Sequence, residues 1–200
     1  MFDEAFRTRF APAVRPVARI LLRAGVTANH VTIASFMLAA AAAALVAGDR
    51  QYAGLALWLI SRVLDGLDGV VAREDGSGSP FGGFLDITLD MAAYSLMVLA
   101  FAALHPEHVV AWIAVLAGYV MVITTTLALS AAATAAARVV SATDRTFQFT
   151  RGLTEAGETS VMYALWVAAP SHIWWLAWVW AAALLITALQ RVQLASRVLR

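Results

Sequence analysis

Four aspartates lie close together in a chain that is otherwise strongly apolar. Asp65 and Asp68 are three residues apart, and Asp86 and Asp90 are four apart, so each pair lies on one face of its own helix. The segment 74–80 between the pairs is rich in Gly and Ser, which is typical of a turn. Helices joined by so short a loop are expected to be antiparallel neighbours, and the two pairs of carboxylates then face each other.

Carboxylates gathered in this way repel one another unless a cation lies between them. Hard oxygen ligands without cysteine or a nearby histidine are typical of Mg²⁺ or Mn²⁺. Two such ions, bridged by four carboxylates, neutralise a pyrophosphate and hold the attacking and leaving oxygens in line, which is the chemistry of phosphoryl transfer. The alternative is a structural ion pair with Arg62, three residues before Asp65, but one arginine does not balance four acids.

The composition of the chain is that of a membrane protein. The 200 residues are 62% hydrophobic and 14% charged, whereas soluble domains average about 45–50% and about 25%. We expect an all-α, polytopic integral membrane protein that forms one domain over residues 1–200, without a cleaved signal peptide. The absence of cysteine excludes disulfides and thiolate metal sites. The net charge of +1 gives no sign of a nucleic-acid partner, and none is expected.

Apolar runs and the breaks between them predict six transmembrane helices, near residues 29–47, 52–73, 81–104, 109–140, 156–169 and 174–190. The segment 2–23 differs, because an apolar stripe at helical spacing alternates there with arginines. This pattern predicts an amphipathic helix at the membrane interface, kinked or divided by Pro12 and Pro16. A helix packed against other parts of the protein is the alternative.

The distribution of arginine predicts the orientation. Six spans place both termini on one side of the membrane, together with the N-terminal arginines, Arg73 and all arginines after residue 137. The loops of the other side contain only Arg50. The positive-inside rule therefore places both termini, and the carboxylates near the ends of the second and third spans, in the cytoplasm. We expect a protein of the cytoplasmic (inner) membrane with a cytoplasmic active site.

The four aspartates belong to a longer pattern. Residues 65–90 read Asp-x2-Asp-Gly-x2-Ala-Arg-x8-Gly-x3-Asp-x3-Asp, which resembles the motif of the class I CDP-alcohol phosphotransferase (CDP-alcohol phosphatidyltransferase) family at every fixed position. The segment 27–32 resembles that family's Thr-Pro-Asn-x-x-Thr, with Ala28 in place of the proline. By resemblance, three aspartates hold a first ion, and Asp90 helps to hold a second and acts as the general base. The predicted ligand set is Asp65, Asp68, Asp86 and Asp90.

The resemblance also implies a substrate. CDP-diacylglycerol lies with its tails in the bilayer, a small water-soluble alcohol attacks its phosphorus, and CMP leaves. The residues implied in binding the CDP-lipid are Asn29, Thr32, Gly69, Arg73, Ser79 and Gly82. Family members are usually homodimers, and a homodimer is expected here.

The acceptor alcohol stays open at this stage. Arg138, Arg145 and Arg151 could bind a phosphorylated acceptor, such as glycerol 3-phosphate or an inositol phosphate. Glu155 and Glu158 could instead bind an amino group, such as that of serine. All five could also be no more than the cytoplasmic rim of the protein.

Two other classes of protein compete with the enzyme. An ion-coupled transporter or a divalent-cation channel also contains carboxylates within the membrane. Transporters usually show internal repeats and sites near the midplane, whereas these acids lie toward one side. A structural membrane scaffold leaves the four acids unexplained.

The orientation predicts which positions a membrane-impermeant thiol reagent reaches. In this cysteine-free chain, Cys placed at His105 or Ser171 should be labelled from outside intact cells, and Cys placed at Ser77 should be labelled only after lysis. Labelling of Ser77→Cys from outside would reverse the orientation.

Overall fold

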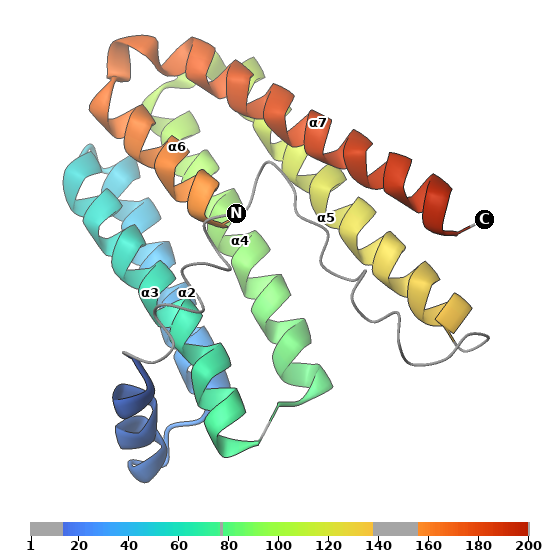
Figure 1. Ribbon diagram of the computed structural model, residues 1–200. Coiled ribbons are helices and arrows are strands. Elements are labelled where there is room, and N and C mark those ends of the chain that lie inside the picture. Colours follow the sequence, from blue (N-terminus) through green and yellow to red (C-terminus); the bar gives the residue numbers. More distant parts are fainter. Residues whose placement is uncertain (1–13, 77, 138–155, 200) are drawn as a thin grey trace.

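The computed structural model describes residues 14–76, 78–137 and 156–199, and within these ranges the chain is helical with no strand (Figure 1). Residues 14–23 are helical. The long helices that follow are α2 (Ala28–Ala47), α3 (Gln51–Asp75), α4 (Pro80–Leu104), α5 (Val109–Ala137), α6 (Ala156–Ala168) and α7 (Ile173–Val198). Short 3-10 turns, η1 (Pro106–His108) and η3 (Pro170–His172), precede α5 and α7. The all-helical class predicted from the composition is confirmed.

The ends of the helices follow local chemistry. Gly25 has a φ of 77° and ends the N-terminal helix, and Gly76, with a φ of 65°, ends α3. Thr27 caps α2: its hydroxyl accepts from the backbone N–H of His30, while the His30 ring accepts from the N–H of Thr27. Ser79 caps α4 by accepting from the N–H of Gly82, with Pro80 as the first helical residue.

Helices lie near each of the ranges predicted as spans, and the bounds differ most at the C-terminus. The last span was expected to end near residue 190, but α7 continues to Val198. Hydropathy predicts where a helix leaves the apolar layer, and not where the helix itself ends. Residues 191–198 contain no Gly or Pro that would end the helix there. Residues 2–13 of the interfacial segment and 138–140 of the fourth span lie outside the described residues.

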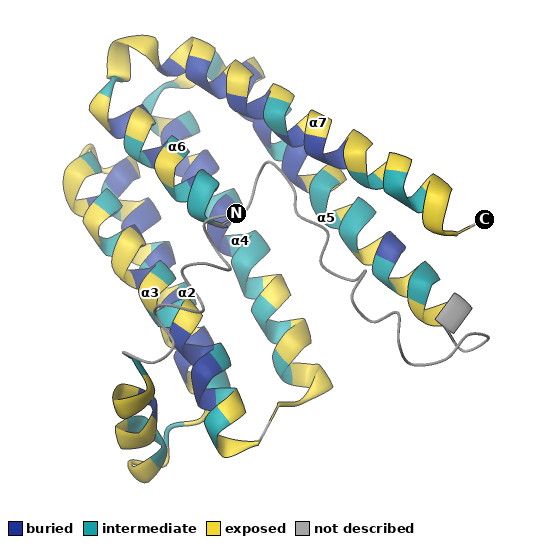
Figure 2. Cartoon of the chain, viewed as in Figure 1, coloured by how far each residue is buried: buried dark blue, intermediate teal, exposed yellow. Residues whose placement is uncertain are grey.

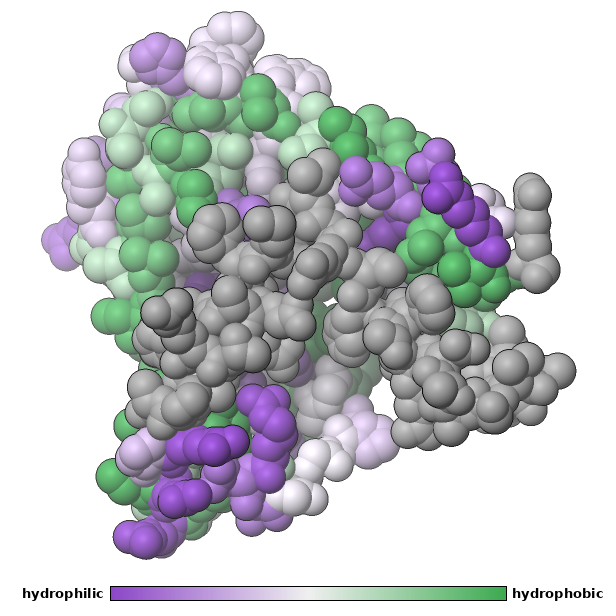
Figure 3. All heavy atoms as spheres, viewed as in Figure 1, coloured by the Kyte–Doolittle hydropathy of each residue, from purple (hydrophilic) through white to green (hydrophobic). Residues whose placement is uncertain are grey.

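Four helical segments in the described part of the chain are long and apolar enough to cross a membrane: Ala28–Ala47, Pro80–Leu104, Pro106–Ala135 and Pro170–Val198. Helix α3 has the length, with 25 residues, but contains the charged motif, and α6 has 13 residues. The six-span topology therefore stays a prediction. On the face shown in Figure 3, and outside the residues drawn in grey, apolar side chains predominate along the sides, and polar ones gather over residues 14–23 and near the end of α7.

Helix α2 organises the half of the molecule that contains the motif. It packs extensively along both α3 and α4, whereas α3 and α4 have no comparable backbone contact with each other in the described structure. The two motif helices are neighbours, as expected, but they meet through long side chains, while their backbones pack on α2. The small buried residues of α2, such as Ala39 and Ala42, permit both approaches.

The other half is built on α5 and α7, which pack along each other and diverge from α2 and α3 away from the end where η1 and η3 lie (Figure 1). A guanidinium nitrogen of Arg191 on α7 donates to the Val122 carbonyl of α5 at 2.9 Å and to the Thr126 hydroxyl. Helix α6 contacts both α3 and α7.

The principal core lies between the helices and is rich in aromatic residues, with exposed residues on the outer faces (Figure 2). Trp58, Trp112, Trp166 and Tyr163 are fully buried in it. A second, smaller core joins Ala18 of the N-terminal helix to Leu67, Val70 and Val71 of α3. That contact places the N-terminal helix beside the carboxylate motif.

Close helix crossings depend on two glycines. A Cβ on Gly54 of α3 would lie 2.8 Å from the Ala42 carbonyl oxygen of α2, and a Cβ on Gly118 of α5 would lie 2.8 Å from Cβ of Leu184 on α7. Contacts this short force the helices apart, because neither a backbone atom nor a Cβ atom can move aside as the end of a side chain can.

We predict that Gly54→Ala destabilises the protein by about 1–3 kcal/mol through this overpacking. The matched control is Gly66→Ala on the same helix, where nothing lies within 4 Å of the added Cβ and alanine should stabilise the helix by about 0.5–1 kcal/mol. Thermal unfolding in detergent, followed by far-UV circular dichroism, measures both. Equal midpoints for the two variants would contradict the tight crossing.

Candidate metal centre and its surroundings

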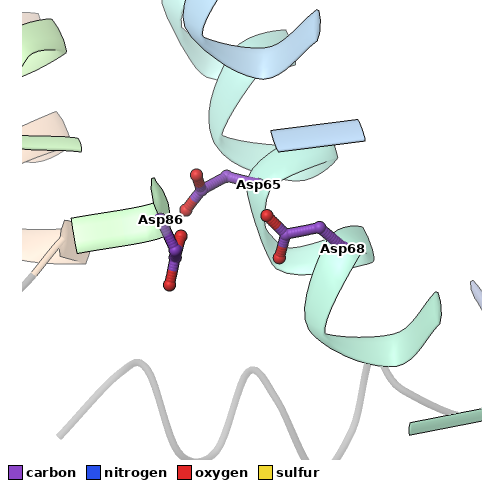
Figure 4. A group of neighbouring side chains, drawn as sticks. All are labelled: Asp65, Asp68 and Asp86. Carbon is purple, nitrogen blue, oxygen red and sulfur yellow. The ribbon is translucent and has the colours of Figure 1, made fainter. Parts of the chain in front are cut away.

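Three carboxylates from two helices meet at one point. Asp65 and Asp68 of α3 and Asp86 of α4 turn toward one another (Figure 4), and each offers an oxygen within 4.8 Å of the other two. We call these residues the carboxylate cluster. Asp68 is buried and the other two are half-buried. The prediction that acids from the two motif helices face each other is confirmed for these three.

Asp68 is held by a hydrogen bond from α2. The buried Thr32 hydroxyl donates to Oδ2 of Asp68 at 2.6 Å and also lies 3.1 Å from the Ala28 carbonyl oxygen, one turn earlier in its helix. A charge-assisted bond of this length fixes the orientation of the carboxylate. Thr32 was predicted to line the CDP moiety; in the structure its hydroxyl is bonded to a member of the carboxylate cluster.

Asp90 is bound to an arginine. Nη1 of Arg62 donates to Oδ1 of Asp90 at 2.6 Å and lies 3.6 Å from Oδ2 of Asp65. The ion pair that the i, i+3 spacing suggested for Arg62 and Asp65 is therefore present, but the shorter contact crosses to α4. The Arg62 guanidinium also lies over the Trp58 ring, 4.6 Å from its centroid, and 5.6 Å from that of Tyr94.

The residues predicted to bind the CDP-lipid lie around these acids. Where α2 and α4 begin, a Cβ added to Gly82 would lie 3.2 Å from Oδ1 of Asn29 and 3.3 Å from Oγ of Ser79. On α3, a Cβ added to Gly69 would lie 3.3 Å from Nη1 of the exposed Arg73. Two groups of candidates, Asn29, Ser79 and Gly82 in one and Gly69 and Arg73 in the other, are thus each brought together.

The candidates for acceptor binding are mostly not described. Arg138, Arg145, Arg151 and Glu155 lie outside the described residues. Glu158 is partly exposed in the first turn of α6. Its helix reaches the motif half through Ser160, whose hydroxyl accepts a 3.1 Å hydrogen bond from the indole of Trp58.

The carboxylate cluster suits a hard divalent cation. Its donors are carboxylate oxygens only, and part of the cluster is withdrawn from water, where three negative charges so close together are unfavourable without a counter-ion. A cation held there and the neighbouring Arg73 guanidinium together suit a substrate that contains phosphate.

Comparison with known proteins agrees with this chemistry. The model of the CDP-alcohol phosphatidyltransferase family matches residues 25–189. The chain belongs to this family. Membership makes it a metal-dependent phosphatidyltransferase, and the region matched contains the complete aspartate motif, helices α2 to α6 and the first part of α7.

Similar proteins match this chain over different shares of its length. The chain is 31% identical to the inner membrane protein YnjF of Escherichia coli over 96% of this chain and 100% of that protein. It is 34% identical to the archaetidylinositol phosphate synthase of Methanothermobacter thermautotrophicus over 50% of this chain and 52% of that protein. It is 40% identical to the phosphatidylinositol phosphate synthase of Mycobacteroides abscessus over 44% of this chain and 40% of that protein.

Solved structures of the phosphatidylinositol phosphate synthase of Mycobacterium tuberculosis share the fold. The complex with manganese and citrate matches with a TM-score of 0.74 and 24% identity, over 90% of this chain and 87% of that one. The form with CDP-DAG bound matches with a TM-score of 0.65 and 25% identity, over 90% and 92%.

Sequence reasoning assigned no functional role to Arg62 and missed the bond from Thr32 to Asp68. The sequence did contain a signal for Arg62, since it lies one turn before Asp65 on the same helix face. No sequence signal indicated that Arg62 pairs with Asp90, because the two residues are 28 positions apart on different helices. The Thr32 bond likewise depends on how α2 packs on α3.

We predict that Thr32→Val weakens Mn²⁺ binding by about tenfold, because loss of a hydrogen bond that orients a ligand typically costs at least that much. Valine keeps the shape and removes the donor. The control is Thr134→Val, an exposed residue whose hydroxyl donates to the Ser130 carbonyl in its own helix. Free Mn²⁺ measured by electron paramagnetic resonance gives both affinities. Equal affinities would show that Thr32 does not orient Asp68.

Proposed function

We propose that this protein transfers a phosphatidyl group from CDP-diacylglycerol to the hydroxyl of a phosphorylated polyol of the inositol phosphate class, with release of CMP. The observation that carries the proposal is the carboxylate cluster inside a complete family motif, where Asp65, Asp68 and Asp86 meet. The acceptor class is supported by the names of relatives, two of which are inositol phosphate synthases of archaeal and bacterial lipids.

The cluster supplies the ligands of a first divalent ion, Mg²⁺ or Mn²⁺. When bound, such an ion neutralises the pyrophosphate and stabilises the charge on the departing CMP. Thr32 orients Asp68 for this role. A second ion, with Asp90 among its ligands, is part of the proposal.

The other residues bind and orient the nucleotide. Gly69 and Gly82 have no side chain, which leaves space for the CDP moiety beside Arg73, Asn29 and Ser79. The Arg73 guanidinium is suited to a phosphate oxygen. Its exposed position next to Gly69 is where a nucleotide arriving from water would meet the protein.

Asp90 acts as the general base. The acceptor oxygen attacks the phosphorus that is attached to diacylglycerol, and its proton passes to the Asp90 carboxylate. The bond from that phosphorus to the bridging oxygen of the pyrophosphate breaks, and CMP leaves with this oxygen. The products are CMP and a phospholipid with a new phosphodiester bond, so every atom is accounted for.

The reaction takes place at the cytoplasmic surface of the inner membrane, in a protein with six spans and both termini in the cytoplasm. The polar end of the molecule near residues 14–23 and the apolar sides support this placement (Figure 3), because one substrate is a lipid and the other dissolves in water. Residues 1–200 then form one domain, and two copies form the homodimer usual in the family.

Release of CMP from CDP-diacylglycerol tests the function. Purified protein with Mg²⁺ or Mn²⁺ should release CMP when inositol 1-phosphate is added, and much less with glycerol 3-phosphate, inositol, serine or choline. Preference for serine would instead favour an amino-group site that includes Glu158. Metal-dependent ion flux in vesicles without CMP release would support the ion-coupled transporter or channel.

Variants of the aspartates separate two roles. Asp86→Asn should lose Mn²⁺ binding and CMP release together, because an amide is a poorer ligand for a hard cation; Asp65→Asn should do the same. Asp90→Asn should still bind metal and CDP-diacylglycerol, while turnover falls by ~10²–10⁴, the range for loss of a general base.

The control for these variants is Asp49→Asn, in the connection between α2 and α3, where Asp49 has a φ of 59° that asparagine tolerates well. It should behave as the unmodified protein does. Near-normal turnover of Asp90→Asn would mean that the proton leaves by another route.

A further inference from the structure

The four aspartates of the motif are divided into three and one. Asp65, Asp68 and Asp86 form the carboxylate cluster, whereas Asp90, on the same helix as Asp86 and one turn further along, is bonded to Arg62 at 2.6 Å. Arg62 also lies 3.6 Å from Asp65. One guanidinium therefore stands between Asp90 and a member of the cluster.

Arg62 is fixed in place more firmly than most arginines. Its side chain is 11% exposed, against 21% for Asp65 and 23% for Asp90. The indole of Trp58, itself fully buried and bonded to Ser160 of α6, lies below the guanidinium. The ring of Tyr94 lies on α4, one turn beyond Asp90, and is also within cation–π distance. These contacts hold the guanidinium in one position. No side-chain entropy therefore has to be lost in each catalytic cycle to place it there.

The contact also joins two helices whose backbones pack on α2 and which meet each other through side chains. Helices α3 and α4 have no extensive backbone contact in the described structure, so the bond from Arg62 to Asp90 sets how the end of one motif helix faces the other. A general base must lie within hydrogen-bond reach of the proton that it takes, and displacement by about 1 Å typically costs on the order of 10²-fold in rate.

We propose that Arg62 is a positioning residue of the phosphatidyl transfer, which holds Asp90 beside the carboxylate cluster and prevents it from joining that cluster. Arg62 binds Oδ1 of Asp90, which leaves the second carboxylate oxygen to face the second ion of the proposed function and the acceptor hydroxyl, whose proton it takes. The inference rests on the proposed function for its rate effects and on the contacts above for its electrostatic effect.

Two substitutions of Arg62 test the role. Arg62→Gln removes the charge and should lower kcat for CMP release by about 10²-fold, while KM for CDP-diacylglycerol stays close to that of the unmodified protein. Arg62→Lys keeps the charge without the planar fork and should recover part of the lost turnover. The control is Arg50→Gln, an exposed arginine in the connection between α2 and α3 that no side-chain bond in the described structure involves.

Metal binding gives a readout that does not depend on turnover. Without Arg62, the charge beside Asp65 is lost and Asp90 is released, so Arg62→Gln should bind Mn²⁺ about tenfold more tightly. A merely structural residue would weaken Mn²⁺ binding when removed. Unchanged or weaker binding in Arg62→Gln, with the protein still eluting as one folded species in detergent, overturns the proposal.

A double variant shows whether Arg62 acts through Asp90. Arg62→Gln combined with Asp90→Asn should turn over no more slowly than Asp90→Asn alone, because both changes remove the same function. If turnover of the double variant falls by the product of the two single losses, the proposal is overturned. Turnover of Arg62→Gln equal to that of the unmodified protein also overturns it. Absence of CMP release from the unmodified protein counts against the proposed function alone, and the Mn²⁺ titration then still decides the role of Arg62.

Discussion

Balance of charge in an apolar surrounding is the constraint on which this structure depends. Carboxylates withdrawn from water are unfavourable unless they are paired or hydrogen-bonded, and four aspartates lie on the two motif helices. The structure meets this cost with specific partners: the Thr32 hydroxyl for Asp68 and the Arg62 guanidinium for Asp90 and Asp65. The negative charge that remains on the cluster is what a divalent cation would neutralise.

The helices are arranged so that these partners reach the acids. Helix α2 contributes Thr32 to the carboxylate cluster and packs along both α3 and α4. Small residues permit this: Gly54 lies against the backbone of α2, and the Ser35 hydroxyl donates to the Ser61 carbonyl across the same contact at 2.8 Å. A larger residue at Gly54 would move α3 away from α2, and with it Asp65 and Asp68.

The aromatic core connects the motif to the rest of the bundle. Trp58 and Tyr94 touch Arg62 on one side, and on the other they pack against Tyr163 and Tyr119 of α6 and α5. The Tyr119 and Tyr163 hydroxyls lie 3.2 Å apart, and the Trp180 indole of α7 donates to Tyr119 at 3.0 Å. Their polar atoms thus have partners inside an apolar core, which favours one fixed arrangement of the helices around the site.

What the sequence determined by itself was largely local or compositional. The apolar content predicted an all-helical membrane protein, the breaks between apolar runs marked where helices begin, and the fixed spacing of the aspartates identified the family. These signals are readable because helical periodicity and capping depend on residues a few positions apart. The end of α7 was misplaced because the polar residues after 190 can continue a helix in water as well as end a span.

Tertiary structure alone decided which partner each acid has. Nothing in the spacing shows that α2 stands against both motif helices, that Thr32 bonds Asp68, or that Arg62 reaches past Asp65 to Asp90. These contacts join residues 28 and 36 positions apart, and they exist only because glycine and alanine at the crossings let the helices approach. The division of four similar carboxylates into a cluster of three and one held by arginine is therefore a property of the packing.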